Sequence, residues 1–229
     1  MQMSGQRVAG PQNGRSSGGP RGIGAGRVGA ALRGAAAALQ ANAAMLAALD
    51  LAAGDGDLGA TAVRIARALS ACADDADETD IGRLLASAGV AVHRAVPSTM
   101  GALIGTALMR AGQQVQGKHI IGPHDLAAML AAADAGLRAR FHVHPGDKTL
   151  VDTIHPAAEA FGRAIEAGAT LPAAGARMIA AARAGRDGVT HRRNRVGRAS
   201  WLGARSAGLA DPGATLALVV LEALATDPP

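Results

Sequence analysis

Apolar residues recur along most of the chain at the spacing of an amphipathic α-helix. One stretch carries them at Leu103, Ile104, Ala107, Leu108, Ala111 and Val115. Another carries them at Leu150, Val151, Ile154, Ala158, Phe161 and Ile165. Positions three and four apart lie on one side of a helix with 3.6 residues per turn. No segment alternates convincingly with the period of two that marks a half-buried strand.

Eight helices account for this pattern. We expect them over about 27–52, from 58 onward, over 81–95, after 97–101, over 123–139, from Leu150 to Ile165, over 171–186, and from Pro212 onward. Thr79 or Asp80 is a suitable cap for the helix over 81–95, and Pro212 is a favoured first-turn residue. Amphipathic helices with short connections predict an all-α fold, an eight-helix antiparallel up-and-down bundle.

Composition refines this fold. Hydrophobic residues make up 49% of the chain, yet it has only two Phe, one Trp and no Tyr, so Ala, Leu and Val must fill the core. Alanine favours helices and lets them pack closely. Residues 1–26 are rich in Gly, Ser, Pro and Arg, and we expect a disordered tail there, followed by one helical domain over 27–229.

The net charge of +5 comes from five arginines that precede the first acidic residue, Asp50. A basic tail can bind nucleic acid or a membrane surface. The interleaved aromatic residues of a base-stacking platform are missing, so we interpret the tail as a solvated segment and do not expect nucleic-acid binding. Cys72 is the only cysteine, which fits a reducing cytoplasm, and we expect no membrane span.

Three carboxylates, Asp50, Asp55 and Asp57, stand close together in the sequence Asp50-Leu-Ala-Ala-Gly-Asp-Gly-Asp-Leu-Gly-Ala-Thr61. Carboxylate oxygens are preferred ligands of Mg²⁺ and Ca²⁺, and the glycines allow the backbone to turn tightly. A helix that starts near Leu58 would direct its positive end at an anion. The segment therefore suggests a site for a metal and a phosphate; the alternative is an acidic surface turn.

The unusual residues lie in four connections, 50–61, 97–101, 144–149 and 196–213. In an antiparallel bundle of eight helices, these are the connections after helices one, three, five and seven, which share one end. We therefore predict a single site at that end. Lys148 is a candidate phosphate ligand as a point charge, and the alternative is an ordinary turn with an Asp or Thr cap. Arg198 is a candidate phosphate ligand as a planar fork. Arg192, Arg193 and Arg195 are interpreted as a solvated stretch.

Other polar or bulky residues carry weaker signals. His142 and His144 are two apart, but zinc needs several more good ligands. His155, Met178 and Trp201 are most simply packing residues.

A set of motifs resembles one known family. They are Asp50-x4-Gly-Asp55-Gly-Asp57-x-Gly59, Gly105-Thr106, Pro145-Gly-Asp-Lys-Thr149, and Gly197-Arg-Ala-Ser-x-Leu-Gly203-x-Arg205-Ser-x-Gly208-x-x-Asp211-Pro-Gly-Ala-Thr215. Over roughly residues 27–226 the chain resembles the nucleotide-binding L subunit (the DhaL or DAK2 domain) of dihydroxyacetone kinases.

This resemblance implies an eight-helix antiparallel barrel that binds ADP or ATP at one end through two Mg²⁺ ions. It implies that Asp50, Asp55 and Asp57 hold the metal. The residues it assigns to the nucleotide are Leu58, Gly59, Ala60 and Thr61 along the phosphates, Thr99 and Met100 in a nucleotide loop, Phe141 and Leu150 on the adenine side, and Arg198, Asp211, Pro212 and Gly213 as a closing group.

The resemblance also implies phosphoryl transfer, in which positioning and charge neutralisation supply most of the catalysis. A separate K subunit would hold dihydroxyacetone or a related ketose. The donor would be ATP in one branch of the family and a phosphotransferase-system protein, acting through a held ADP, in the other. The loop Pro97-Ser-Thr-Met-Gly101 departs from the family's Gly-Gly-x-Ser-Gly, so the alternative is a non-catalytic regulatory or scaffolding member.

Overall fold

The structure, a computed structural model, describes residues 22–74 and 80–225. Over these residues it contains nine α-helices, one 3₁₀-helix and two very short strands. The elements are β1 (Ile23–Gly24), α1 (Ala25–Ala41), α2 (Ala43–Ala53), α3 (Leu58–Asp74), α4 (Ile81–Ala95), α5 (Thr99–Gln114), β2 (Ile120–Ile121), α6 (Pro123–Phe141), α7 (Val151–Glu166), α8 (Leu171–Gly188), η1 (Arg198–Ser206) and α9 (Pro212–Ala225).

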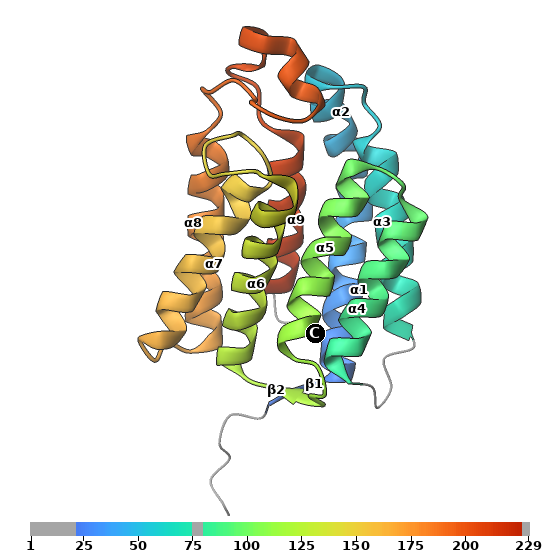
Figure 1. Cartoon of the computed structure of the whole chain (residues 1–229), viewed down its shortest axis with the longest axis vertical. Coiled ribbons are helices and arrows are strands. Elements are labelled where there is room, and N and C mark those ends of the chain that lie inside the picture. Colours follow the sequence, from blue (N-terminus) through green and yellow to red (C-terminus); the bar gives the residue numbers. More distant parts are fainter. Residues whose placement is uncertain (1–21, 75–79, 226–229) are drawn as a thin grey trace, which may run out of the picture.

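Eight of the helices form a closed ring. Contacts run from α1 to α3, then in sequence order from α3 through α9, and α9 returns to α1. Neighbouring helices are antiparallel, and α2 with η1 lies across the upper end of the ring in Figure 1. The predicted all-α antiparallel bundle is therefore confirmed.

Small residues let some of these helices approach closely. A Cβ at Gly89 of α4 would lie 2.8 Å from the carbonyl oxygen of Gly105 in α5, and a Cβ at Gly105 would lie 2.8 Å from the carbonyl oxygen of Gly89. Alanine at either position would push the two backbones apart. The interior is aliphatic, and its fully buried side chains include Leu39, Leu46, Ile65, Leu137 and Leu216.

The helix expected over 27–52 is two helices, so this boundary prediction was wrong. α1 and α2 meet at Asn42 and are bent by 59°. The Asn42 side-chain Nδ2 donates to the carbonyl oxygen of Ala38 at 2.9 Å, as its backbone N–H does at 3.1 Å. An asparagine side chain that bonds to the backbone competes with the regular helical pattern.

The N-terminal boundary also differs. Ile23 pairs antiparallel with Ile121 and Gly24 with Ile120, and α1 begins at Ala25, so residues 23–26 belong to the fold and not to the expected tail. The rest of the expected tail, residues 1–21, lies outside the described residues. No single helix of the described chain is long and apolar enough to cross a membrane; only the bent pair of α1 and α2 meets that test of length and composition.

Candidate nucleotide and metal site

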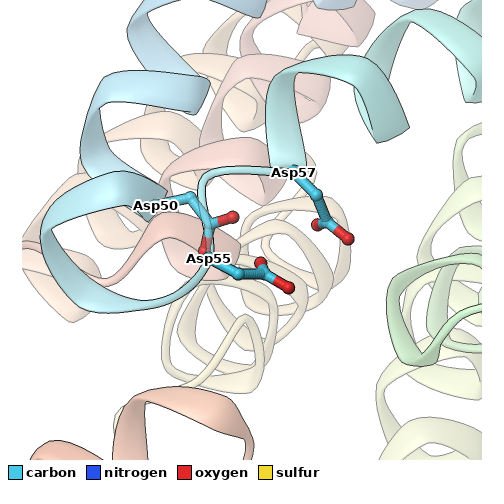
Figure 2. A group of neighbouring side chains, drawn as sticks. All are labelled: Asp50, Asp55 and Asp57. Carbon is cyan, nitrogen blue, oxygen red and sulfur yellow. The ribbon is translucent and has the colours of Figure 1, made fainter.

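The three carboxylates of the acidic segment converge on one point (Figure 2). Asp50 lies in the last turn of α2, Asp55 in the connection, and Asp57 immediately before α3. One oxygen from each lies within 4.8 Å of the others. Among the described residues, this is the only such group of three potential metal ligands. Three hard oxygen donors at this separation fit Mg²⁺ or Ca²⁺ in donor chemistry.

Local backbone bonds shape the acidic segment. Asp50 is only 8% exposed, and its Oδ2 accepts the backbone N–H of Leu58 at 3.0 Å. The Gly54 N–H donates to the Asp50 carbonyl oxygen, and Gly56 turns the chain with φ of 77°. The bond from the Leu58 N–H to Asp50 Oδ2 ties the end of α2 to the start of α3, and Asp55 and Asp57 face the same side as Asp50.

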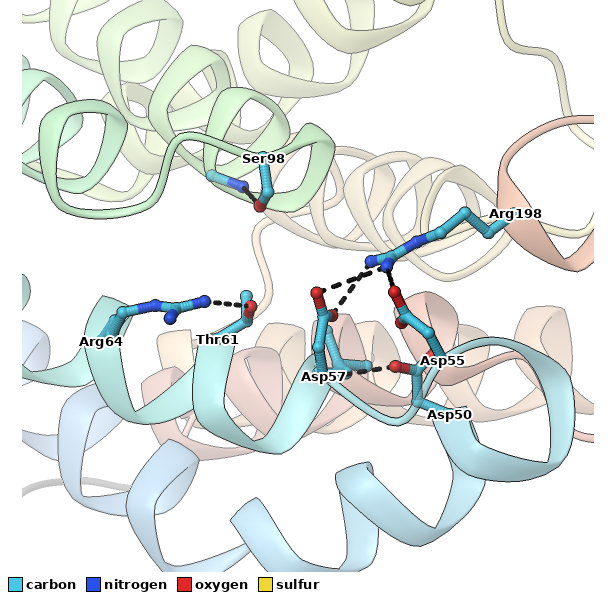
Figure 3. A network of polar contacts seen from close by, with 9 residues as sticks. Asp50, Asp55, Asp57, Thr61, Arg64, Ser98 and Arg198 are labelled. Atoms are coloured by element: carbon cyan, nitrogen blue, oxygen red, sulfur yellow. Dashed lines mark hydrogen bonds and ion pairs between the residues drawn. The ribbon is translucent and has the colours of Figure 1, made fainter.

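Arg198 of η1 reaches this acidic group from the opposite side (Figure 3). Its Nη2 lies 3.0 Å from Asp57 Oδ1 and its Nη1 lies 3.3 Å from Asp57 Oδ2. Nη1 also pairs with Asp55. The hydrogen bond to Asp57 raises the pKa of Arg198, with further support from the charge of Asp55. The guanidinium neutralises part of a charge cluster that would otherwise repel itself.

The first turn of α3 stands directly beside these side chains. Leu58, Gly59 and Thr61 are buried, whereas Ala60 is exposed. A Cβ at Gly59 would lie 2.5 Å from the carbonyl oxygen of Ala43, which explains why α2 and α3 can pack so closely here. Thr61 Oγ1 accepts from Arg64 Nη2 at 3.1 Å.

Two further loops meet at the same end. A Cβ at Gly213 would lie 3.3 Å from Met100 Cε and 3.9 Å from the backbone nitrogen of Leu150. Met100 and Phe141 pack at the edge of a small apolar cluster that contains buried Leu150. Thr99 is exposed at the start of α5, where Ser98 Oγ accepts the N–H of Gly101 at 3.3 Å.

Asp211 caps the last helix. Its Oδ2 accepts the N–H of Ala214 at 2.8 Å, and its Oδ1 accepts from Asn194 Nδ2 at 2.7 Å. Burial raises the pKa of Asp211, and these two bonds partly oppose that effect. Pro212 follows as the first residue of α9 and is buried with it.

All four unusual loops therefore meet at one end of the ring, as the connection order predicts. Arg198 joins the last loop to the acidic segment, and Gly213 joins it to the loops of Met100 and Leu150. Helices α3, α5, α7 and α9 all begin at this end (Figure 1). Helix N-termini carry partial positive charge, which favours an anionic ligand next to a bound cation.

Comparison with known proteins identifies the family. The sequence pattern of the DAK2 domain matches residues 52–226. The chain belongs to the DAK2-domain family. This chain is 32% identical, over 184 residues, to the ADP-binding subunit DhaL of the PEP-dependent dihydroxyacetone kinase of Escherichia coli, covering 79% of this chain and 86% of that one.

Several other relatives are much longer, and this chain spans only about a third of their length. The L-erythrulose 1-kinase of Mycolicibacterium smegmatis is 35% identical over 80% of this chain and 32% of its own length. Human triokinase/FMN cyclase is 32% identical over 78% of this chain and 31% of its own length. The dihydroxyacetone kinase of C. freundii has a similar fold, with a TM-score of 0.68 and 23% identity over 98% of this chain and 38% of that one.

Lys148 is buried away from the site, so the candidate role of a phosphate ligand was wrong for this residue. The side chain is 1% exposed, and its Nζ donates to the carbonyl oxygens of Thr190, Arg192 and Ser206 at 3.0, 2.8 and 2.7 Å. All three donor hydrogens of an ammonium group are thereby used inside the protein. Backbone carbonyls that gather around a buried lysine leave no signal in the sequence.

The three residues expected to be packing residues differ in their exposure to solvent. Met178 is buried at 4% exposure, as expected. Trp201 is 86% exposed on η1, so its expected packing role was wrong. His155 is partly buried and pairs through Nδ1 with Asp134 Oδ2 at 2.9 Å, beside a cavity of about 670 Å³ between α6 and α7. The sequence gives no direct signal of this pair; its members stand out only through two i,i+4 charge spacings, Asp134–Arg138 and His155–Glu159.

Proposed function

We propose that this DAK2 domain binds ADP or ATP with Mg²⁺ and serves as the L-type subunit of a dihydroxyacetone-kinase-like enzyme. The observation that carries the proposal is the convergence of Asp50, Asp55 and Asp57 within 4.8 Å at the end where four helices begin. A solved relative in fold, the dihydroxyacetone kinase from C. freundii in complex with AMP-PNP and Mg²⁺, supports it with a TM-score of 0.65.

In this proposal, Asp50, Asp55 and Asp57 hold the metal, with two Mg²⁺ ions in the full site. Bound Mg²⁺ would neutralise charge on the transferring phosphoryl group. The residues Leu58 to Thr61 border the phosphates. Arg198 transfers from the carboxylates to a phosphate oxygen when the nucleotide binds, because a guanidinium can pair with either group in a planar fork.

The adenine would rest on the apolar cluster at the same end. Leu150 and Phe141 form its wall, and Met100 packs against the same cluster and lies beside Gly213. Thr99 borders the opening, and the turn of Asp211, Pro212 and Gly213 closes the far side. Apolar walls with a few placed polar groups are the usual lining of a nucleotide-sized site.

The acceptor would be dihydroxyacetone or a related ketose on a separate K-type subunit. The chain covers 86% of the ADP-binding subunit of E. coli, which supports a subunit role, but only about a third of triokinase and the erythrulose kinases. The donor would be ATP, or a phosphotransferase-system phosphocarrier that acts on held ADP.

One observation favours a second candidate, a non-catalytic regulatory or scaffolding subunit. Met100 occupies the nucleotide loop at the position where the family has a small hydroxyl residue, and its Cε would lie 3.3 Å from a Cβ at Gly213. Its side chain takes up space at the edge of the proposed adenine site, and this would weaken nucleotide binding.

Calorimetric titration with ADP and with ATP, each with and without Mg²⁺, tests the proposal. We expect Mg²⁺-dependent binding that Asp57→Asn abolishes and that the matched change at exposed Asp187 leaves intact. Phosphoryl transfer in the presence of a K-type subunit would exclude the regulatory candidate. Lack of nucleotide binding by a folded, nucleotide-free sample would reject the proposed site.

A further inference from the structure

Lys148 binds the two ends of one long segment together. Its three carbonyl partners lie at Thr190 and Arg192 on one side of the segment 190–206 and at Ser206 on the other. The residue itself has φ of 63°, in the left-handed region that non-glycine residues seldom adopt. Such a conformation persists when surrounding contacts determine it.

Other bonds complete this closure. The Asn194 N–H donates to Ser206 Oγ at 3.0 Å, and its Nδ2 donates to the Lys148 carbonyl oxygen at 2.8 Å and to Asp211. The Gly208 N–H donates to the Thr190 carbonyl oxygen at 2.9 Å. These bonds join four buried residues, each less than 9% exposed: Lys148, Asn194, Ser206 and Asp211.

A buried ammonium group is costly unless its donors are paired. Burial lowers the pKa of Lys148, whereas the nearby charge of Asp211 opposes this effect. Because the three acceptors belong to the two ends of one segment, the ammonium group is fully paired only when that segment is closed. Opening the segment would therefore expose three carbonyls and release the lysine to water.

The closed segment carries Arg198 and Trp201. Between its tied ends lies the 3₁₀-helix η1, which is interrupted at Gly203 and begins after Gly197, a glycine with φ of 72°. Long 3₁₀ runs have poor hydrogen-bond geometry and little stability of their own. The placement of η1 over the acidic group thus depends on how its ends are held.

We propose that Lys148 is a positioning residue that closes the segment 190–206 and so places Arg198 at Asp55 and Asp57. The ammonium group of Lys148 binds three backbone carbonyls and pairs with neither Asp55 nor Asp57. The consequence for ligand binding rests on the proposed function, whereas the placement of the segment can be measured without any ligand.

The chain offers its own probe and control for this measurement. Trp201 is the only tryptophan and lies within the segment, so its fluorescence anisotropy reports the segment's motion. Lys118 is the only other lysine; it is exposed and pairs with Asp125 at the opposite end of the ring. Lys148→Met and Lys118→Met are therefore a matched pair, with helix content checked by circular dichroism.

We expect lower Trp201 anisotropy and faster trypsin cleavage after Arg192, Arg193, Arg195, Arg198 and Arg205 in folded Lys148→Met. Lys118→Met should match the unmodified chain in both. Unchanged anisotropy and cleavage in folded Lys148→Met would overturn the proposal. If Lys148→Met does not fold, amine acylation of the unmodified protein decides: Lys118 should react quickly and Lys148 slowly, and equal rates would overturn the proposal.

Ligand binding then separates positioning from mere stabilisation. We expect Mg²⁺–ADP affinity to fall about ten- to hundredfold in folded Lys148→Met, the range for loss of one charge-assisted hydrogen bond. Unchanged affinity together with lowered anisotropy would overturn the positioning role. Absence of nucleotide binding in the unmodified chain would instead refute the proposed function, and anisotropy and acylation would still decide whether Lys148 closes the segment.

Discussion

Arg198 and Asp57 are 141 residues apart in sequence, yet Arg198 Nη2 lies 3.0 Å from Asp57 Oδ1. The same guanidinium pairs with Asp55, so one cation spans two of the three proposed metal ligands. Arg198 and a divalent cation would therefore compete for the same oxygens. Metal binding at these carboxylates would then release Arg198 from Asp55 and Asp57.

This competition predicts opposite effects of Arg198→Gln on two affinities. Binding of Mg²⁺ alone should strengthen by up to about fivefold, because an exposed ion pair contributes up to about 1 kcal/mol. Binding of Mg²⁺–ADP should weaken, because a phosphate partner is lost. Calorimetry of the variant beside exposed Arg193→Gln measures both, and weaker binding of Mg²⁺ alone would contradict the competition.

Asp50 has a structural task besides its proposed metal contact. Asp50→Ala should lower the free energy of unfolding by about 1–3 kcal/mol, because the Leu58 N–H loses its acceptor in a buried place. Asp50→Asn keeps an acceptor oxygen and should lose Mg²⁺ affinity with a smaller change in stability. Urea unfolding and calorimetry separate the two effects, and equal destabilisation by both variants would argue against this division.

Trp201 is predicted to be covered when the K-type subunit binds. It is 86% exposed on η1, whose Arg198 reaches Asp57 at the end where phosphoryl transfer would occur, so its emission should shift to shorter wavelength in the complex. Trp201→Ala should weaken the complex at least about tenfold, the effect expected of an aromatic anchor. Ile120→Ala, an exposed change in β2 at the other end, is the control; equal loss in both variants would contradict this interface.

Asp211 should make stability depend on pH. Burial raises the pKa of Asp211 in the folded state above the ordinary value of 3.8. At a pH between 3.8 and this raised pKa, the folded state holds more protons than the unfolded state. The free energy of unfolding should therefore fall as pH rises through this window, relative to that of Asp211→Asn. Urea unfolding over a pH series tests this, with Asp187→Asn as control; a constant difference between the wild type and Asp211→Asn would refute it.

Much of the fold could be predicted because local signals agreed with packing. The helix over 81–95 has the predicted bounds, and Asp80 caps it through bonds to the N–H groups of Gly82 and Arg83. The convergence of four loops followed from the order of antiparallel helices alone. It required no knowledge of any side-chain contact.

The errors arose where distant contacts decide the outcome. Lys148 resembles a phosphate ligand in sequence, but carbonyls that follow it by 42 to 58 residues bind it instead. Trp201 is apolar enough for a core, yet η1 lies outside the ring and leaves it in solvent. Neither outcome can be derived from residue type or spacing.

The bend at Asn42 sets the position of Asp50, a proposed metal ligand that lies eight residues further along the chain. Asp50 lies eight residues further on, about 12 Å along the helix axis, so a 59° change of direction moves it by about 12 Å from where a straight helix would put it. A substitution that straightened this junction would remove Asp50 from the other two carboxylates. The geometry of the proposed metal site therefore depends partly on the side-chain amide of Asn42, at the opposite end of α2.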